Sequence, residues 1–494
     1  MFKLQNILSL STALLEGLFF SGLVFGWPSM SSVLESAGYF NYLCDNDVTN
    51  ATNVSVSNIS TTTTCKLQQE QISLVYTVAT LALSFSTIFN GFMFDYCGTW
   101  LSRAVATILF ATGCFLMFTS SPSTSLFLFP AMCCFSVGGI LMLITNMQLG
   151  NLFGQARSSV ITLLNGALDS SSFVFLLVKL AYDNGFSLTS IFQFMAICSL
   201  FQILRTFLLM PRTHIPFPLP SSSYKYGIHD CGCGKDDPDP AEAPDKLNED
   251  TDDVVDGEDD VSCMDCLKTV HFWSNLFHMS VLQLRNYFFL ATFTTWLRTL
   301  LPENDDSQFT LYLSAFGICQ FFGVVTSPIN GLLIDVATKI FKRETDNDTL
   351  ASSQAVCVSA FVTCILGVIF STVVTIPNLP IQYLSFVLQV VFRSFLYGGN
   401  ASFIALLFPG KHFGRLYGLT MTLAGVVGFL QFPLFSLVLW VFENDFTIIN
   451  VVFIAVCALT VIHPITLYMS CKKKLSVQPT YKQPVEMQLL TANA

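Results

Sequence analysis

Long apolar runs recur along the whole 494-residue chain and limit the folds that it can adopt. A helix needs about 20 apolar residues in a row to cross the hydrocarbon core of a membrane. Charged residues make up 11% of the chain, against about 25% in an average soluble protein. Twelve runs are long enough, near residues 8–33, 72–94, 102–120, 126–150, 158–181, 187–210, 271–298, 309–334, 351–376, 381–408, 415–442 and 446–470. The sequence therefore predicts an all-α membrane protein with twelve transmembrane helices.

The positions of Lys and Arg predict the orientation, because these residues are enriched on the cytoplasmic side of a membrane. With both termini inside, most of the 23 basic residues fall in cytoplasmic loops or helix ends, Arg103 and Arg205 among them. Only Lys66, Lys179 and Arg298 fall outside. We expect a multi-pass plasma-membrane protein with cytoplasmic termini. We also expect a monomer in the lipid bilayer, with no nucleic-acid partner, because the net charge of -10 comes largely from one acidic loop.

The segment 35–71 is predicted to be extracellular and polar. Acceptor sequons for N-glycosylation lie there at Asn50, Asn53 and Asn58. Cys44 and Cys65 flank these sequons in an oxidising compartment, which favours a disulfide over two free thiols.

A long connection, 211–268, separates an N-terminal part, 1–210, from a C-terminal part, 269–470, and a cytoplasmic tail follows at 471–494. The connection is rich in proline and then in acidic residues, and it has too little apolar surface to fold alone. We interpret it as a disordered cytoplasmic linker. Its four cysteines, Cys231, Cys233, Cys263 and Cys266, leave zinc binding open as an alternative, and lipidation of Cys263 or Cys266 is another. We predict no metal site there.

The two apolar parts repeat each other. The sequence Phe89-Asn-Gly-Phe-Met-Phe-Asp95 in the first part matches Ile329-Asn-Gly-Leu-Leu-Ile-Asp335 in the second. Parallel repeats of this kind predict two bundles of six helices about an axis along the membrane normal.

The spacing Gly91-x-x-x-Asp95-x-x-Gly98, followed by Arg103, resembles the signature of the loop between helices 2 and 3 in the major facilitator superfamily. Gly331 and Asp335 form a partial second copy. The resemblance implies that these residues form a cytoplasmic gate, in which a carboxylate pairs with a basic residue.

A narrower resemblance covers almost the whole chain outside the linker and the tail. The Gly26-Trp-Pro-Ser turn, the blocks ITNMQLGNLFGQARSS and NGALDSSS, the run RTFLLMPRTHIPFPLP and the segment VFRSFLYGGNASF are similar to solute carrier family 43. That family includes facilitative carriers of nucleobases and of large neutral amino acids. The LDSSS block around Asp169 favours the nucleobase branch, whereas Arg285 resembles the amino-acid branch.

Polar residues within the apolar runs are the candidates for substrate binding, since an ionisable group in a membrane is costly unless it has a function or a partner. Asp169 lies about three turns inside the fifth run. The full set is Glu16, Asn146, Asn165, Asp169, Gln283, Arg285, Arg393, Tyr397 and Asn400. The alternative is that Asp169 with Arg393, and Glu16 with Arg285, are structural pairs that contact no substrate.

The resemblance implies a facilitative, sodium-independent carrier of adenine, guanine and hypoxanthine that works by alternating access and supplies purine salvage. A carrier of large neutral amino acids or of another small organic solute is the second hypothesis, and a receptor-like protein without transport is the third. The sequence contains no Walker motif, catalytic triad or metalloprotease motif, so we expect neither an enzyme nor a cofactor.

Overall fold

The structure is a computed structural model, and it describes residues 4–44, 65–215, 262–302, 305–343, 347–408 and 412–477. The three sequons at Asn50, Asn53 and Asn58 lie outside these ranges, as do Cys231 and Cys233. Their predicted roles therefore stay predictions. The disulfide between Cys44 and Cys65, which are 21 positions apart in sequence, is present and confirms the predicted pairing.

Helices make up both halves of the molecule. The N-terminal half, residues 4–215, contains α1 (Leu4–Glu16), η1 (Gly17–Ser21), η2 (Leu23–Gly26), α2 (Trp27–Ser36), η3 (Asn41–Leu43), α4 (Lys66–Thr119), η4 (Pro122–Phe127), α5 (Leu128–Met147), η5 (Gln148–Ala156), α6 (Arg157–Ser170), α7 (Phe173–Asp183) and α8 (Leu188–Leu209). The C-terminal half, residues 262–477, contains α9 (Cys263–Leu267), α10 (Val270–Leu300), α11 (Asp306–Phe321), α12 (Gly323–Phe341), α13 (Asp348–Thr375), α14 (Gln382–Leu407), α15 (Phe413–Gly428), α16 (Gln431–Trp440), α17 (Thr447–Leu459) and α18 (Ile462–Val477).

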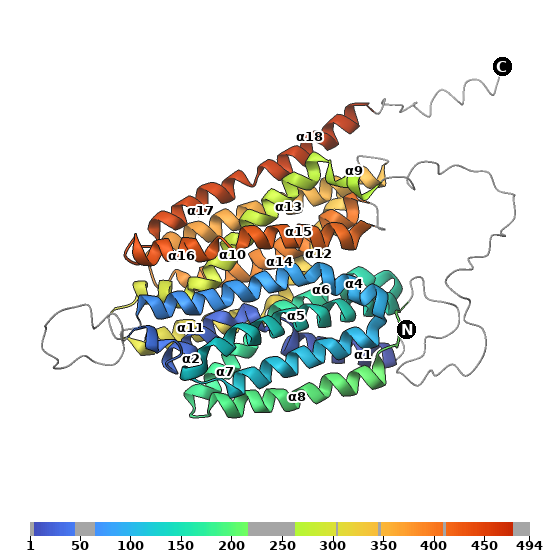
Figure 1. Ribbon diagram of the computed structural model, residues 1–494. Helices are drawn as coiled ribbons and strands as arrows, with labels where there is room; N and C mark the ends of the chain where they lie inside the picture. The colour runs from blue at the N-terminus through green and yellow to red at the C-terminus, as the bar shows by residue number, and fades with distance from the viewer. Residues whose placement is uncertain are drawn as a thin grey trace, which may run out of the picture.

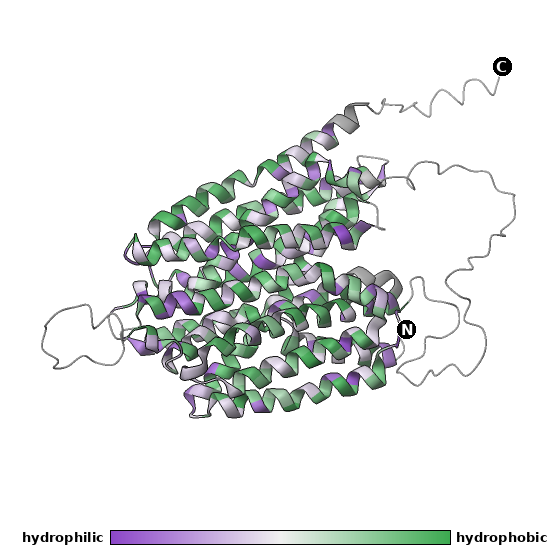
Figure 2. Cartoon of the chain, in the orientation of Figure 1, coloured by the Kyte–Doolittle hydropathy of each residue, from purple (hydrophilic) through white to green (hydrophobic). Residues whose placement is uncertain are grey.

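The long helices of both halves run roughly parallel and form two groups that lie against each other (Figure 1). The start of α1 and the end of α18 lie at one end of the molecule, and α2, α7 and α16 reach the other (Figure 1). Hydrophobic residues, drawn in green, are spread along the helices of both halves (Figure 2). Large apolar side chains are exposed on the outer helices, for example Phe194 and Ile197 on α8. Such surfaces suit contact with lipid.

Nine helices among the described residues are long and apolar enough to cross a membrane, and a bent pair, Leu4–Ser21 with Leu23–Ser36, raises the number to ten. The 54-residue α4 holds two of the predicted runs, because its chain turns at Gly98, where φ is 73°. Glycine adopts this left-handed conformation without steric cost. The all-α membrane fold is confirmed, whereas the count of twelve spans stays a prediction.

Residues at both ends of the predicted linker have a defined structure. The backbone N–H groups of Thr99 and Trp100, next to the turn at Gly98, donate hydrogen bonds to the carbonyl oxygens of Thr213 and Arg212, each at 3.2 Å. Ile215 is buried, and its N–H donates to the side-chain oxygen of Gln148 at 3.0 Å. At the other end, residues 263–267 form α9. Residues at both ends of the predicted linker thus have hydrogen-bond partners or helical structure, and the boundaries at 211 and 268 stay predictions.

Glycines allow the helices of the N-terminal half to approach very closely. A Cβ atom at Gly139 on α5 would lie 1.8 Å from the backbone oxygen of Ser21 on η1. Gly139→Ala must therefore separate these helices, and we expect it to lower the free energy of unfolding by about 1–3 kcal/mol. Thermal unfolding of purified variants measures the effect. Gly414→Ala is the control, because no atom lies within 4 Å of the Cβ that it adds. Equal unfolding temperatures for both variants would contradict the close approach.

Candidate functional site

An ion pair joins the two halves. Nε of Arg393 on α14 lies 3.2 Å from a carboxylate oxygen of Asp169 on α6. Nη2 of Arg393 also donates a hydrogen bond, 2.5 Å long, to the backbone oxygen of Asp169. Both side chains are buried, at 0% and 5% exposure. The predicted pair is therefore present, and its two charges neutralise each other.

Aromatic rings from both halves surround this pair. The N-terminal half contributes Phe25, Trp27 and Tyr76, and the C-terminal half contributes Tyr287 and Tyr397. The ring of Phe25 lies 6.4 Å from those of Tyr287 and Tyr397, and Trp27 stacks on Tyr76 at 5.7 Å. The guanidinium carbon of Arg393 lies 5.2 Å from the centre of the Phe25 ring. These distances suit a site whose walls are aromatic faces.

Several buried polar atoms near this cluster have no hydrogen-bond partner within the described part of the chain. They are Trp27 Nε1, Tyr76 Oη, Gln283 Oε1 and Nε2, and Arg393 Nη1. A buried polar group without a partner costs about 1–3 kcal/mol. Their concentration around one ion pair indicates a place that receives a polar ligand or water.

Helix interruptions meet beside the same cluster. The chain bends by 53° at the break between η1 and η2, and α6 and α11 both end where a second helix, α7 or α12, follows within a few residues. A Cβ at Gly22 would lie 2.1 Å from the backbone oxygen of Leu168, and one at Gly26 would lie 2.2 Å from that of Ser172. Interrupted helices inside a membrane require buried or solvated surroundings for their free backbone groups, and such breaks commonly form substrate sites.

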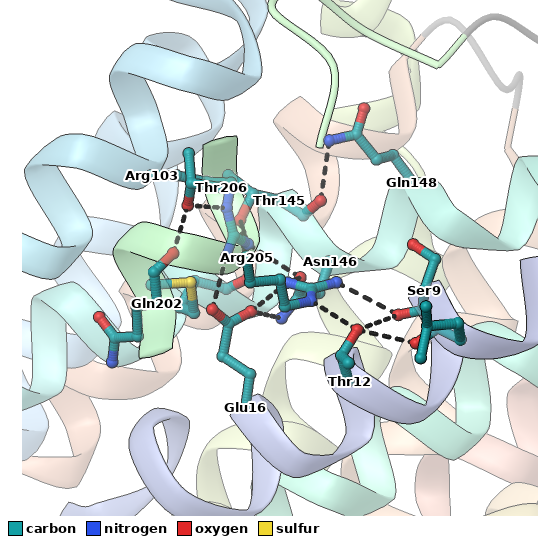
Figure 3. A network of polar contacts seen from close by, with 12 residues as sticks. Ser9, Thr12, Glu16, Arg103, Thr145, Asn146, Gln148, Gln202, Arg205 and Thr206 are labelled. Atoms are coloured by element: carbon teal, nitrogen blue, oxygen red, sulfur yellow. Dashed lines mark hydrogen bonds and ion pairs between the residues drawn. The ribbon is translucent and has the colours of Figure 1, made fainter. Parts of the chain in front are cut away.

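Glu16 belongs to a separate network inside the N-terminal half (Figure 3). Its carboxylate forms ion pairs with Arg103, at 2.5 Å, and with Arg205. The side-chain oxygen of Asn146 accepts hydrogen bonds from both guanidinium groups, and its amide donates to Glu16 at 2.9 Å. All four side chains are buried. The network joins α1, α4, α5 and α8.

This network corrects one predicted pairing and leaves two other calls as predictions. Arg103 is predicted as part of a cytoplasmic gate and Arg205 as a cytoplasmic helix end, and both are buried inside the bundle. The cause is the turn at Gly98, which places Arg103 more than one helical turn into the second arm of α4. The alternative pairing of Glu16 with Arg285 is wrong, since Glu16 is already paired twice.

Arg285 lies inside the C-terminal half, away from the ion pair. Its Nε donates to the hydroxyl of Ser371 at 2.9 Å. Its guanidinium carbon lies 4.7 Å from the ring centre of Phe370, 5.2 Å from that of Phe453 and 5.8 Å from that of Phe289. Among the described residues it forms no ion pair with a carboxylate. Aromatic faces thus hold this cation through cation–π contacts.

Two further candidates have partners of their own. The side-chain oxygen of Asn400 accepts a hydrogen bond from Asn275 at 2.8 Å, and both residues line a small cavity with His278 and His463. Asn165 donates to a backbone oxygen of its own helix at 3.0 Å. Of the nine predicted substrate residues, the structure thus brings Asp169, Arg393 and Tyr397 together at the ion pair, and Glu16 and Asn146 together in the separate network.

The predicted gate residues are only partly arranged as expected. Gly98 forms the turn in α4. A Cβ atom added at Gly331 would lie 3.9 Å from the side chain of Thr162 in the other half. No atom lies within 4 Å of a Cβ added at Gly91. Asp95 and Asp335 are exposed, and neither forms an ion pair with a described side chain. Their role as a gate stays a prediction.

Comparison with known proteins agrees with this architecture. The model of the Major Facilitator Superfamily matches residues 9–344. The chain belongs to the major facilitator superfamily. Within the superfamily, it is 38% identical to equilibrative nucleobase transporter 1 of Bos taurus, over 95% of this chain and 97% of the relative. This likeness confirms the resemblance to solute carrier family 43.

Other relatives share the superfamily fold. Large neutral amino acids transporter small subunit 3 of Homo sapiens is 27% identical, with 86% of each chain covered. A crystal structure of the nucleoside transporter NupG superposes with a TM-score of 0.56 at 11% sequence identity, and the match covers 94% of this chain and 100% of that one. At this identity the likeness shows the fold alone. The named relatives in the family are transporters. The protein is therefore a membrane transporter of the solute carrier family 43 type.

Sequence reasoning missed most of the aromatic cluster. The chain contains 48 Phe and 14 Tyr, and an aromatic residue within an apolar run has no feature that separates a site residue from one that faces lipid. Tyr397 was predicted as a polar residue within an apolar run, and Trp27 had a signal because it lies in the Gly-Trp-Pro-Ser turn. Phe25, Tyr76 and Tyr287 had none.

Proposed function

We propose that the protein is a facilitative, sodium-independent transporter of purine nucleobases, such as adenine, guanine and hypoxanthine, at the plasma membrane. Alternating access of the site between the two halves moves the base down its gradient, toward purine salvage in the cell. Both termini lie in the cytoplasm, and the transporter works as a monomer.

The mutual neutralisation of Asp169 and Arg393 carries this proposal. A zwitterionic amino acid needs one cation and one anion that are free to pair with it, whereas the two charges here are already paired with each other. A nucleobase is flat and neutral, with polar atoms on its edge. Aromatic faces match its rings, and the partnerless hydroxyl, indole and amide groups match its edge. The name of the Bos taurus relative supports the same substrate class.

Transport of large neutral amino acids is the second candidate, and the Homo sapiens relative at 27% identity is the observation that favours it. In that case the ion pair must open, so that Arg393 binds the substrate carboxylate and Asp169 binds its ammonium group.

Uptake of radiolabelled adenine and leucine separates the two candidates. In cells that express the protein and lack endogenous nucleobase carriers, we expect saturable adenine uptake that guanine and hypoxanthine inhibit. Choline in place of sodium, or a protonophore, leaves the initial rate unchanged, because no ion gradient drives the transport. Leucine uptake with no adenine uptake would favour the second candidate. Loss of adenine uptake without sodium would contradict facilitative transport.

A further inference from the structure

A helix of the C-terminal half is broken at Phe322, between α11 and α12. A break of this kind frees carbonyl groups at the end of α11 and N–H groups at the start of α12. Helices usually meet this need with a Ser, Thr, Asp or Asn at the residue before the helix. Phe322 occupies that position in α12 and has no side-chain atom that can accept a hydrogen bond. The cap must therefore come from elsewhere.

Ser170, at the end of α6 in the opposite half, supplies it. The hydroxyl of Ser170 accepts a hydrogen bond from the N–H of Val324, the second residue of α12, at 2.7 Å. The same hydroxyl donates to the backbone oxygen of Phe321, the last residue of α11, also at 2.7 Å. One buried side chain thus satisfies a free donor and a free acceptor on the two sides of the break.

Small residues make this contact possible. A Cβ at Gly323 would lie 2.9 Å from the Cβ of Asp169 and 3.2 Å from the hydroxyl oxygen of Ser170. A Cβ at Gly166, one helical turn earlier on α6, would lie 2.9 Å from Ser327 and Val324. The start of α12 is therefore pressed against the end of α6. The Cβ of Asp169 thus lies beside the first residue of α12.

We propose that Ser170 of the N-terminal half caps the interrupted helix of the C-terminal half. In this way it acts as a positioning residue for the ion pair of Asp169 and Arg393. The cap exists only while the two halves are packed at this point. Its formation and loss therefore accompany any movement that separates α6 from α12. This inference rests on the packing of the halves and does not depend on which solute is carried.

Hydrogen exchange at the helix break tests the cap without any substrate. In the purified full-length chain, Ser170→Ala removes the acceptor for Val324 N–H, so the peptide that contains Val324 should exchange about tenfold faster. Ser171→Ala is the matched control: its hydroxyl is equally buried in the same turn but has no partner among the described residues, so exchange should stay at the wild-type rate. Equal exchange in the two variants would overturn the proposal.

Transport kinetics test the positioning role. We expect Ser170→Ala to raise the KM severalfold at normal surface abundance, and Ser171→Ala to leave it unchanged. If Ser170 acts through Asp169, the effects of Ser170→Ala and Asp169→Asn on KM are less than additive in the double variant. Full additivity would overturn the positioning role but would not bear on the proposed substrate. Absence of adenine uptake by the wild-type protein would overturn the proposed substrate but would not bear on the cap.

The wild-type chain provides a second measurement if Ser170→Ala does not fold. The amide of Val324 should then exchange as slowly as amides in the interior of α12, because Ser170 protects it. Exchange as fast as that of an uncapped helix end would overturn the proposal.

Discussion

Glu16→Gln is expected to remove most of the folded protein from the membrane. The carboxylate of Glu16 is the only anion in a buried network with two guanidinium groups, those of Arg103 and Arg205. The substitution leaves two buried cations that repel each other and lack a counter-charge. Breaking a buried ion pair from one side costs roughly 3–5 kcal/mol. Surface biotinylation and the unfolding temperature of the purified protein measure this loss.

Glu70→Gln is the matched control for this prediction. The carboxylate of Glu70 also accepts two hydrogen bonds, from the hydroxyl of Ser436 at 2.7 Å and from the indole N–H of Trp440 at 3.0 Å. These partners are neutral and partly exposed, so a glutamine can keep one acceptor contact at small cost. Wild-type abundance of Glu16→Gln would show that the network does not hold α1, α4, α5 and α8 together.

Arg393→Gln is expected to abolish transport and to lower the amount of folded protein. It leaves Asp169 buried without its cation, at a cost of roughly 3–5 kcal/mol. The double variant with Asp169→Asn has no buried charge at this position, so its surface abundance should return. Its transport should not return, because the ion pair and the partnerless Nη1 of Arg393 belong to the proposed site. Uptake divided by surface protein separates the two effects.

Arg285→Gln provides the control for a buried arginine in the same half. Its guanidinium has a serine hydroxyl and three phenyl rings as neighbours, so its removal leaves no carboxylate uncompensated among the described residues. We expect nearly normal abundance and transport. Wild-type transport by the double variant of Asp169 and Arg393 would instead mean that the pair is only structural.

The sequence was sufficient to predict the fold class and one of the two buried charge clusters. Apolar runs and a repeat identify the helices, and the cost of a buried charge requires Asp169 to find a basic partner. The sequence could not place Arg103 and Arg205, because an arginine near a helix end can either extend to the surface or turn into the bundle. Which of these occurs depends on packing between α4, α5 and α8, and periodicity contains no such information.

The break between α11 and α12 was also beyond prediction. The run 309–334 reads as one continuous helix, and Phe322 is neither a glycine nor a proline. The break is stabilised by Ser170, which lies 154 positions before its partner Val324 in the chain. Local propensity cannot reveal an interruption whose partner belongs to the other half.

The position of Trp27 gives the transporter an intrinsic optical probe. The chain has only five tryptophans, and Trp27 is fully buried beside Tyr76, with an indole N–H that has no partner in the described structure. Indole emission depends on the polarity and stacking of its surroundings. With the other four tryptophans replaced by phenylalanine, fluorescence would report occupancy of the aromatic cluster directly, in detergent or in vesicles, without radiolabel and without net flux.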